Sequence, residues 1–288
     1  MVANSQKSLS DFSFFVPFLI AFWYSSRMQL LYALLLGIVQ GVTEFLPVSS
    51  TAHLVLAERL LGASPQIFGL SFDASLHLGT LGAILIYFRA DLSKILKNTQ
   101  GFKLLLLLVV GTVPAVVVGV FLQNLIESLF RTPLVIATML IFFSFVFWVV
   151  EKNSHKNNTL DKLSYKQGFL VGCLQVLALI PGVSRSGIVI SGGLLLGLVE
   201  ADAARFAFLL SIPIVALAGG KSFLSVVAKG FIGGFNSSEL MIFGVGMVTS
   251  ALVGFATIDF FLRFLKKGSL TPFIIYRIAL GILILFFV

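Results

Sequence analysis

The chain has 288 residues, of which 58% are hydrophobic and 11% charged, and its mean hydropathy is +1.05. A chain of this length cannot keep so much apolar surface out of water in one soluble core, so the composition excludes a soluble domain and predicts a polytopic membrane protein. The formal net charge of +8 comes from Lys and Arg residues in short loops between apolar runs, where they set topology, and we expect no nucleic-acid partner.

The beginning of the chain differs from the rest. It contains an apolar run, Phe12 to Tyr24, which Pro17 interrupts and which is too short to cross a bilayer. We interpret residues 1–27 as a leader or a disordered arm. Residues 28–288 are predicted to form a single integral membrane domain.

Hydrophobic periodicity predicts an all-α protein, and two of its helical segments are too short to span a membrane. A helix of 12 residues rises only about 18 Å, whereas the hydrocarbon core is about 30 Å thick. The segments that follow Pro47 and Pro181 are this short, so each is predicted to be half of a re-entrant hairpin. The predicted segments are 29–46, 50–61, 70–88, 103–122, 133–150, 166–180, 186–197, 204–228, 238–264 and 271–288.

The two breaks resemble each other in sequence. GIVQ precedes LPVSS at the first break, as GCLQ precedes IPGVSRS at the second. The similarity predicts two five-helix units, about 29–150 and 166–288, each a re-entrant hairpin followed by three transmembrane helices. Because three crossings is an odd number, the second unit is expected to be inverted relative to the first.

The loop charges agree with this plan, because most basic residues fall on one predicted face. By the positive-inside rule that face is cytoplasmic. Both termini then lie outside, the first hairpin enters from the exterior and the second enters from the cytoplasm. The basic residues expected on the cytoplasmic face are Arg89, Lys94, Lys97, Lys103, Lys152, Lys156, Lys162, Lys166, Arg205, Arg263, Lys266 and Lys267.

Gln40 and Glu44 lie four residues apart just before the first break, so they share a helix face. An ionisable side chain at membrane depth costs about 2.5 to 3.5 kcal/mol on insertion scales, which points to a function for Glu44. A carboxylate there can hold a divalent cation, Mg²⁺ or Ca²⁺, with the help of Gln40.

Both breaks are followed by polar helix starts, whose free N–H groups and partial positive charge favour an anion. Arg185 adds a planar guanidinium that matches phosphate oxygens. The two breaks together therefore predict a phosphate-binding site. Its candidate substrate-binding residues are Ser49, Thr51, Gly182, Ser184 and Ser186, and its candidate catalytic residues are Glu44, Ser50, His53 and Arg185.

Simpler interpretations exist for several of these residues. Glu44 and Arg185 also fit a structural ion pair between the repeats, and serines at helix starts often serve only as caps. Asp73 and His77 share a face of the next helix, where the sequence favours a structural role over a supporting role in the site. His53 follows a serine pair, which favours a function for it.

The segments LGIVQGVTEFLPVSSTAH and LIPGVSRSG resemble the BacA-type undecaprenyl-diphosphate phosphatases, a family named for bacitracin resistance. Gln40 and Glu44 match the family's Glu/Gln-x-x-x-Glu pattern, and Pro181 to Ser186 match its PGxSRS pattern. The resemblance extends over nearly everything after Met28. Gln40 is the Gln variant of a position that is Glu in other members, so we expect it to assist rather than to carry proton chemistry.

The resemblance implies that the chain removes the terminal phosphate from undecaprenyl diphosphate, a polyprenyl lipid substrate, and so recycles the carrier lipid for cell-wall polymers. It implies assistance by Mg²⁺ or Ca²⁺ at a site on the outer side of the plasma membrane, among membrane lipids. A homodimer is left open.

In the mechanism that we derive from these motifs, Arg185 clamps the diphosphate and Glu44 holds the cation. Ser50 attacks phosphorus and His53 serves as base and then acid. The nucleophile stays open among Ser50, His53 and water. The main alternative function is a lipid-phosphate transporter or flippase, which needs a similar anion site but neither nucleophile nor base.

Overall fold

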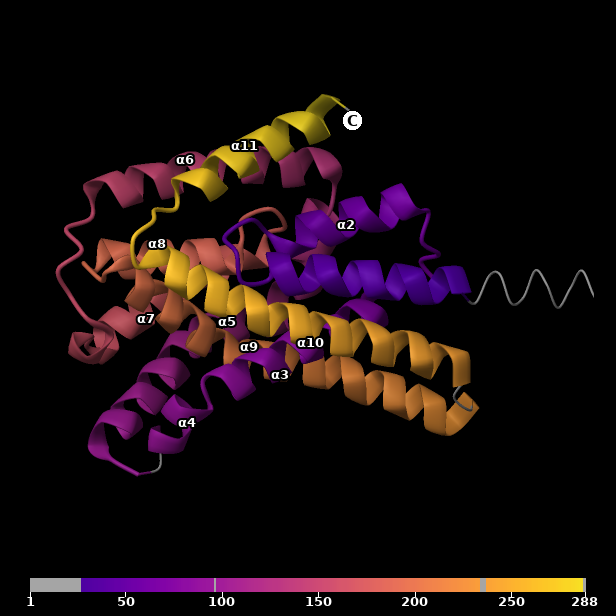
Figure 1. Ribbon diagram of the computed structural model, residues 1–288, viewed down its shortest axis with the longest axis horizontal. Helices are drawn as coiled ribbons and strands as arrows, with labels where there is room; N and C mark the ends of the chain where they lie inside the picture. Colours follow the sequence, from indigo (N-terminus) through magenta and orange to yellow (C-terminus); the bar gives the residue numbers. More distant parts are fainter. Residues whose placement is uncertain (1–26, 96, 234–236, 287–288) are drawn as a thin grey trace, which may run out of the picture.

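A computed structural model describes residues 27–95, 97–233 and 237–286, and every regular element in these ranges is a helix (Figure 1). The prediction for residues 1–27 lies outside the described residues except for Arg27. The first half comprises an N-terminal helix (Arg27–Thr43), α2 (Ser50–Leu61), α3 (Leu70–Tyr87), α4 (Arg89–Ile95), α5 (Thr99–Phe130) and α6 (Pro133–Asn153). The second half comprises η1 (Leu160–Lys162), α7 (Tyr165–Gln175), η2 (Val176–Leu179), α8 (Arg185–Leu195), α9 (Glu200–Gly233), α10 (Ser237–Leu265) and α11 (Thr271–Phe286).

Several helices are long and apolar enough to cross a membrane, which confirms the predicted all-α polytopic membrane protein. Among the described residues there are four, or five if α3 and α4, which are bent by 73° relative to each other, form one span. The predicted span 271–288 is described only to residue 286 and gives a helix of 16 residues. The four clear spans are Thr99–Leu122, Pro133–Asn153, Glu200–Gly220 and Ser237–Leu265.

The two short half-helices are present where the sequence predicts them. α2 has 12 residues and α8 has 11. Each begins after a serine with positive φ, Ser49 at 73° and Ser184 at 77°. This backbone conformation is strained for a residue with a side chain, by about 1 to 3 kcal/mol, and such residues cluster at functional sites. The two breaks therefore share a backbone geometry, and the inverted repeat of the whole chain stays a prediction.

Helix ends differ from the prediction where the sequence is polar. α4 is missing from the predicted segments, and α5 and α9 continue past the predicted ends at residues 122 and 228. Hydropathy detects only the apolar part of a helix, so it misses a short charged helix such as α4 and the polar ends of longer ones. In the region of the predicted segment 166–180, the α-helix α7 ends at Gln175, because the 3₁₀ turn η2 follows it.

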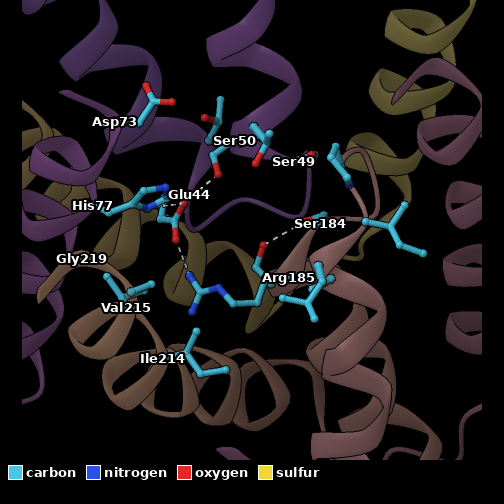
Figure 2. Close-up of a pocket in the computed structure, with 18 of the residues that line it drawn as sticks. Glu44, Ser49, Ser50, Asp73, His77, Ser184, Arg185, Ile214, Val215 and Gly219 are labelled. Atoms are coloured by element: carbon cyan, nitrogen blue, oxygen red, sulfur yellow. Dashed lines mark hydrogen bonds and ion pairs between the residues drawn. The ribbon is translucent and has the colours of Figure 1, made fainter. Parts of the chain in front are cut away.

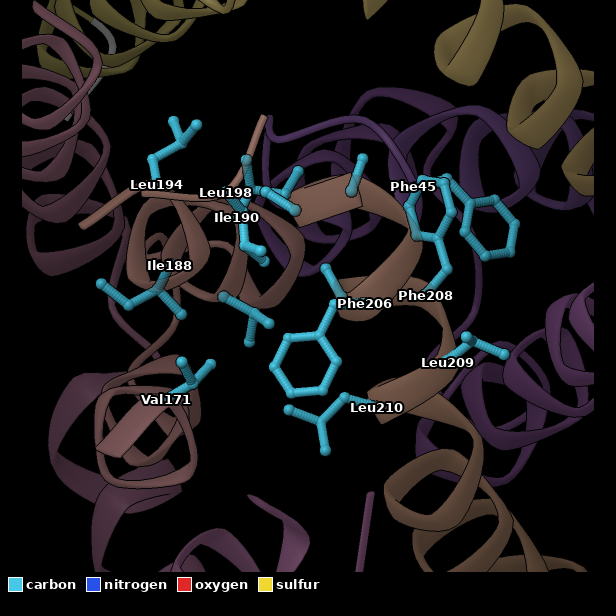
Figure 3. Close-up of a cluster of buried hydrophobic side chains, with 14 of the residues drawn as sticks. Phe45, Val171, Ile188, Ile190, Leu194, Leu198, Phe206, Phe208, Leu209 and Leu210 are labelled. Carbon is cyan, nitrogen blue, oxygen red and sulfur yellow. The ribbon is translucent and has the colours of Figure 1, made fainter. Parts of the chain in front are cut away.

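The main packing partners come from opposite predicted units. α3 packs against α10 and α9, α6 packs against α11, and α5 packs against α7 (Figure 1). Figure 3 shows the core between them, in which side chains of α9 meet those of α7 and α8. Phe45, next to Glu44, joins this core through an edge-on contact with Phe208, at 5.3 Å between ring centroids. The core therefore fixes the first break against α9.

Candidate active site

A pocket of about 380 Å³ lies where the two breaks meet (Figure 2). Its polar wall comes from the breaks, from α3 and from Arg131 between α5 and α6, and its apolar wall comes from α9 and from residues 178–181 before α8. This combination suits a ligand with a charged head and a hydrocarbon tail. The polar lining includes Thr43, Glu44, Ser49, Ser50, Thr51, Asp73, His77, Arg131, Ser184, Arg185 and Ser186, and the α9 lining includes Ile214, Val215, Ala218 and Gly219.

Glu44 and Arg185 form an ion pair across the pocket. Oε1 of Glu44 lies 2.5 Å from Nη2 of Arg185, and the two side chains are only 5% and 16% exposed. Nη1 of Arg185 is buried and makes no hydrogen bond in the described part of the chain. Buried donors normally have partners, so this free nitrogen of a pocket-lining arginine points to an anionic ligand.

The second oxygen of Glu44 meets Ser50. Ser50 Oγ donates to Oε2 of Glu44 at 2.7 Å, and Gln40 Nε2 donates to the same oxygen at 3.1 Å. A hydroxyl within hydrogen-bonding distance of a carboxylate is the arrangement of a nucleophile beside its base. The predicted residues Glu44, Ser50 and Arg185 are therefore brought together.

Gln40 and His77 contact Glu44 on its Oε2 side and orient it. Gln40 is fully buried and does not line the pocket. Its amide nitrogen also lies 2.9 Å from Nδ1 of His77, which is 3.6 Å from Oε2 of Glu44. The Gln40 amide nitrogen thus lies between the Glu44 carboxylate and the His77 ring, and it connects the two side chains. Gln40 therefore supports Glu44 from outside the pocket lining, and its predicted help in holding a cation stays a prediction.

His53 lies outside the pocket lining, which corrects its predicted place beside Ser50. Its Nδ1 is 2.8 Å from the Ser49 carbonyl, and its Nε2 is 2.7 Å from the Tyr276 hydroxyl of α11. The two rings also stack, at 5.6 Å between centroids. The carbonyl at the start of α2 and the phenol of α11 occupy both ring nitrogens, so the imidazole is held toward α11. Glu44 is the base that the geometry places next to Ser50.

The serines of the second break line the pocket and also fix the backbone. Ser184 Oγ accepts from the Gly187 N–H at 3.2 Å and so caps α8. Ser186 Oγ lies 3.2 Å from Ser184 Oγ and donates to the Leu46 carbonyl at 2.9 Å. The sequence left a pure capping role open for Ser49 and Ser186, whereas the side-chain cap of α8 is Ser184, and Ser186 connects one break to the other.

Gly182 does not line the pocket, which corrects its prediction as a substrate-binding residue. Its φ is +97°, and a Cβ atom built there would lie 2.6 Å from the Ile136 carbonyl oxygen. The glycine is required because the break turns sharply against α6.

Ser49 and Thr51 line the pocket at the start of α2. α2 has no side-chain cap, unlike α8. The first N–H groups of a helix without a cap remain available to an anion, and the positive end of the helix dipole favours one.

Two arginines near the site were not predicted from the sequence. Arg131, between α5 and α6, lines the pocket and lies 3.4 Å from Asp73 of α3. Arg277 of α11 is completely buried and donates to the carbonyls of Pro47 and Gly182, one in each break. The available signal was an arginine within the apolar segment 271–288, since a charge at membrane depth indicates a function or a specific partner.

The donor set for a divalent cation is small. No group of three or more His, Cys, Asp or Glu side chains suited to a metal exists among the described residues. Glu44 is the one carboxylate beside Ser50 and Arg185, and both of its oxygens already accept hydrogen bonds. The site fits a cation only if most of its ligands are diphosphate and water oxygens, which is a common arrangement for Mg²⁺.

Comparison with known proteins gives the family. The family described as "Bacitracin resistance protein BacA" matches residues 33–283. The chain belongs to the BacA family. Relatives named undecaprenyl-diphosphatase include one from Saccharophagus degradans, 40% identical over 88% of this chain and 96% of its own length, and one from Trichlorobacter lovleyi, 43% identical over 88% and 96%. A protein named undecaprenyl-diphosphatase 2 from Stutzerimonas stutzeri is 42% identical over 90% of this chain and 98% of its own length.

Proposed function

We propose that this BacA-family chain is an undecaprenyl-diphosphate phosphatase, which hydrolyses undecaprenyl diphosphate to undecaprenyl phosphate and phosphate. Family membership and the names of its relatives support the activity. The observation that carries it is the Ser50 hydroxyl on the Glu44 carboxylate, 2.7 Å apart, beside a buried arginine with a free nitrogen. This activity recycles the carrier lipid for cell-wall polymers, consistent with bacitracin resistance.

The first step transfers the terminal phosphoryl group to Ser50. Arg185 Nη1 and the first N–H groups of α2 bind this phosphate and neutralise its charge. Glu44 accepts the Ser50 proton as Oγ bonds to phosphorus, and the anhydride P–O bond breaks. The proton passes to the departing undecaprenyl phosphate.

The second step hydrolyses the phosphoserine. Water attacks phosphorus and gives a proton to Glu44, which passes it to Ser50 Oγ as that oxygen leaves. Gln40 and His77 hold Glu44 in place through both steps. A transporter needs no hydroxyl–carboxylate pair, and the names of the relatives do not support that alternative.

The substrate diphosphate is expected to bring a divalent cation, Mg²⁺ or Ca²⁺, with Glu44 as its protein ligand. The cation would neutralise charge on the diphosphate. EDTA should therefore lower phosphate release at least tenfold, and added Mg²⁺ or Ca²⁺ should restore it. Full activity in EDTA, with metal analysis showing no retained ion, would exclude the cation.

The apolar wall from α9 suits the polyprenyl chain, which is soluble only in lipid. Ile214, Val215 and Gly219 face the pocket from this wall (Figure 2). The pocket thus combines phosphate-binding groups with a surface for the first isoprene units, and membrane lipids surround the helices. The oligomeric state stays open, with a homodimer as one alternative.

We propose that the protein resides in the plasma membrane, with the pocket open to the exterior or periplasm. A second cavity supports this orientation. It is lined by Lys94 of α4, Lys103 of α5 and Arg205 of α9, which are all predicted to be cytoplasmic and which the fold brings to one place. In a Cys173→Ala background, Gln66→Cys should react with a membrane-impermeant maleimide in intact cells. His155→Cys should react only after permeabilisation. The opposite pattern would reverse the orientation.

Phosphate release in detergent tests the function. The purified protein should release phosphate from undecaprenyl diphosphate and none from undecaprenyl phosphate, which serves as the control. Detergent micelles have no sides between which transport can occur, so release there cannot come from a transporter. Absence of release across a range of cations would contradict the proposed function.

A further inference from the structure

α11 contributes a side chain that contacts both breaks. Arg277 is 0% exposed, and its Nη1 donates to the Pro47 carbonyl at 3.3 Å. Its Nη2 donates to the Gly182 carbonyl at 3.0 Å, and its Nε donates to Ser144 Oγ of α6 at 2.9 Å. One guanidinium therefore joins three separate segments of the chain.

The two carbonyls belong to the segments that carry the chemistry. Pro47 lies midway between Glu44 and Ser50 in the sequence, and Gly182 lies three residues before Arg185. Neither Arg277 nor its two break partners line the pocket. Arg277 thus touches the backbone that presents the reacting groups, from outside the pocket lining.

The acceptors of Arg277 make packing alone a poor explanation. Within the described residues, the four hydrogen bonds of Arg277 all go to neutral oxygens, the fourth being the Leu140 carbonyl, and the arginine forms no ion pair. A buried cation without a carboxylate stabilises a fold less well than an apolar side chain of the same size. Its planar fork can instead fix the relative positions of several carbonyls.

The neighbouring residue acts on the same region. The Tyr276 hydroxyl is 2.7 Å from Nε2 of His53, whose Nδ1 bonds to the Ser49 carbonyl. Two consecutive residues of α11 therefore reach the first break on both sides of the Ser50 helix start.

We propose that Arg277 is a positioning residue, which sets the distance between the two breaks and so aligns Ser50 and Glu44 with Arg185. The inference rests on the proposed phosphatase function. A misplacement of about 1 Å between reacting groups can lower turnover about 10²-fold. Arg277 would thus control kcat without contacting the substrate.

The test compares Arg277→Met and Arg277→Lys with the wild type. We measure kcat and KM for undecaprenyl diphosphate in detergent, per folded protein, together with the unfolding midpoint. Arg277→Met should lower kcat about 10²-fold with KM changed less than about threefold. Arg277→Lys keeps the charge but has a single nitrogen, so it should fold and still lose about tenfold in kcat.

Ser144→Ala is the matched control. It removes the Arg277 partner on α6 and leaves both break carbonyls in contact with the arginine. Its kcat should stay within about twofold of the wild type, although its unfolding midpoint falls. A purely structural arginine would lower the midpoint in all variants and leave kcat per folded molecule unchanged.

The outcomes separate the two proposals. Wild-type protein without phosphate release overturns the proposed function, and the role of Arg277 with it. An active wild type with normal kcat in Arg277→Lys, or in a folded Arg277→Met, overturns the positioning role alone. A loss of kcat in Ser144→Ala as large as that in Arg277→Met also overturns it. If Arg277→Met does not fold, the kcat of Arg277→Lys alone tests the positioning role.

Discussion

Replacing Ser50 by alanine is expected to lower kcat for phosphate release by roughly 10³-fold or more, the scale for loss of a nucleophile. The hydroxyl is the group that Glu44 holds for attack on phosphorus, at 2.7 Å. The measurement is phosphate release from undecaprenyl diphosphate at saturating substrate. Acid quenching during turnover should also trap a phosphorylated protein in the wild type and none in the variant.

Ser75→Ala provides the control for this experiment. Ser75 is a buried serine of α3. It donates to the Phe72 carbonyl of the same helix and does not line the pocket. Its kcat should stay close to the wild-type value. Near-normal turnover in Ser50→Ala would assign the attack to water, with Glu44 as its base.

Replacing Arg185 by alanine is expected to lower kcat/KM about 10²- to 10³-fold, as for loss of one stabiliser of transition-state charge. Its Nη1 is the free donor in the pocket, and its Nη2 holds Glu44. Breaking a buried ion pair leaves an uncompensated charge and costs about 3 to 5 kcal/mol, so stability should also fall.

The double variant Glu44→Gln, Arg185→Gln separates catalysis from a structural ion pair. Removing both charges avoids the uncompensated carboxylate, so the unfolding midpoint should recover relative to Arg185→Ala. Activity should remain lost, because neither the base nor the phosphate-binding cation is present. Recovery of activity together with stability would show that the pair is structural.

Much of the site could be predicted because its residues lie in two short, contiguous motifs. The prolines and serines that interrupt the apolar sequence predicted α2 as residues 50–61, and the structure places it at Ser50–Leu61. The cost of Glu44 and Arg185 at membrane depth identified them as functional, and they meet in the pocket. Their roles stay predictions until the variants are measured.

The directions of side chains at the breaks could not be predicted. Ser50 and His53 both lie in α2, three residues apart, but helical spacing does not show that the Ser49 carbonyl and the Tyr276 hydroxyl of α11 take both ring nitrogens of His53. Gly182 was predicted to bind substrate because it lies in the second motif, whereas α6 lies against it. Neither result is visible without the packing of α6 and α11.

Contacts between segments far apart in the chain could not be predicted from the sequence either. Arg277 reaches Pro47 across 230 residues, and His77 approaches Gln40 across 37. Such contacts depend on which helices pack together. A single sequence gives no information about that choice once all helices are similarly apolar.

The contact of Arg277 with both breaks has a consequence for biogenesis. The arginine is synthesised 95 residues after Gly182 and 230 residues after Pro47. Both breaks are therefore synthesised before the guanidinium that joins them exists. A nascent chain arrested before α11 should already contain Ser50, Glu44 and Arg185 and should be unable to turn over lipid, so activity begins only when translation has delivered this helix.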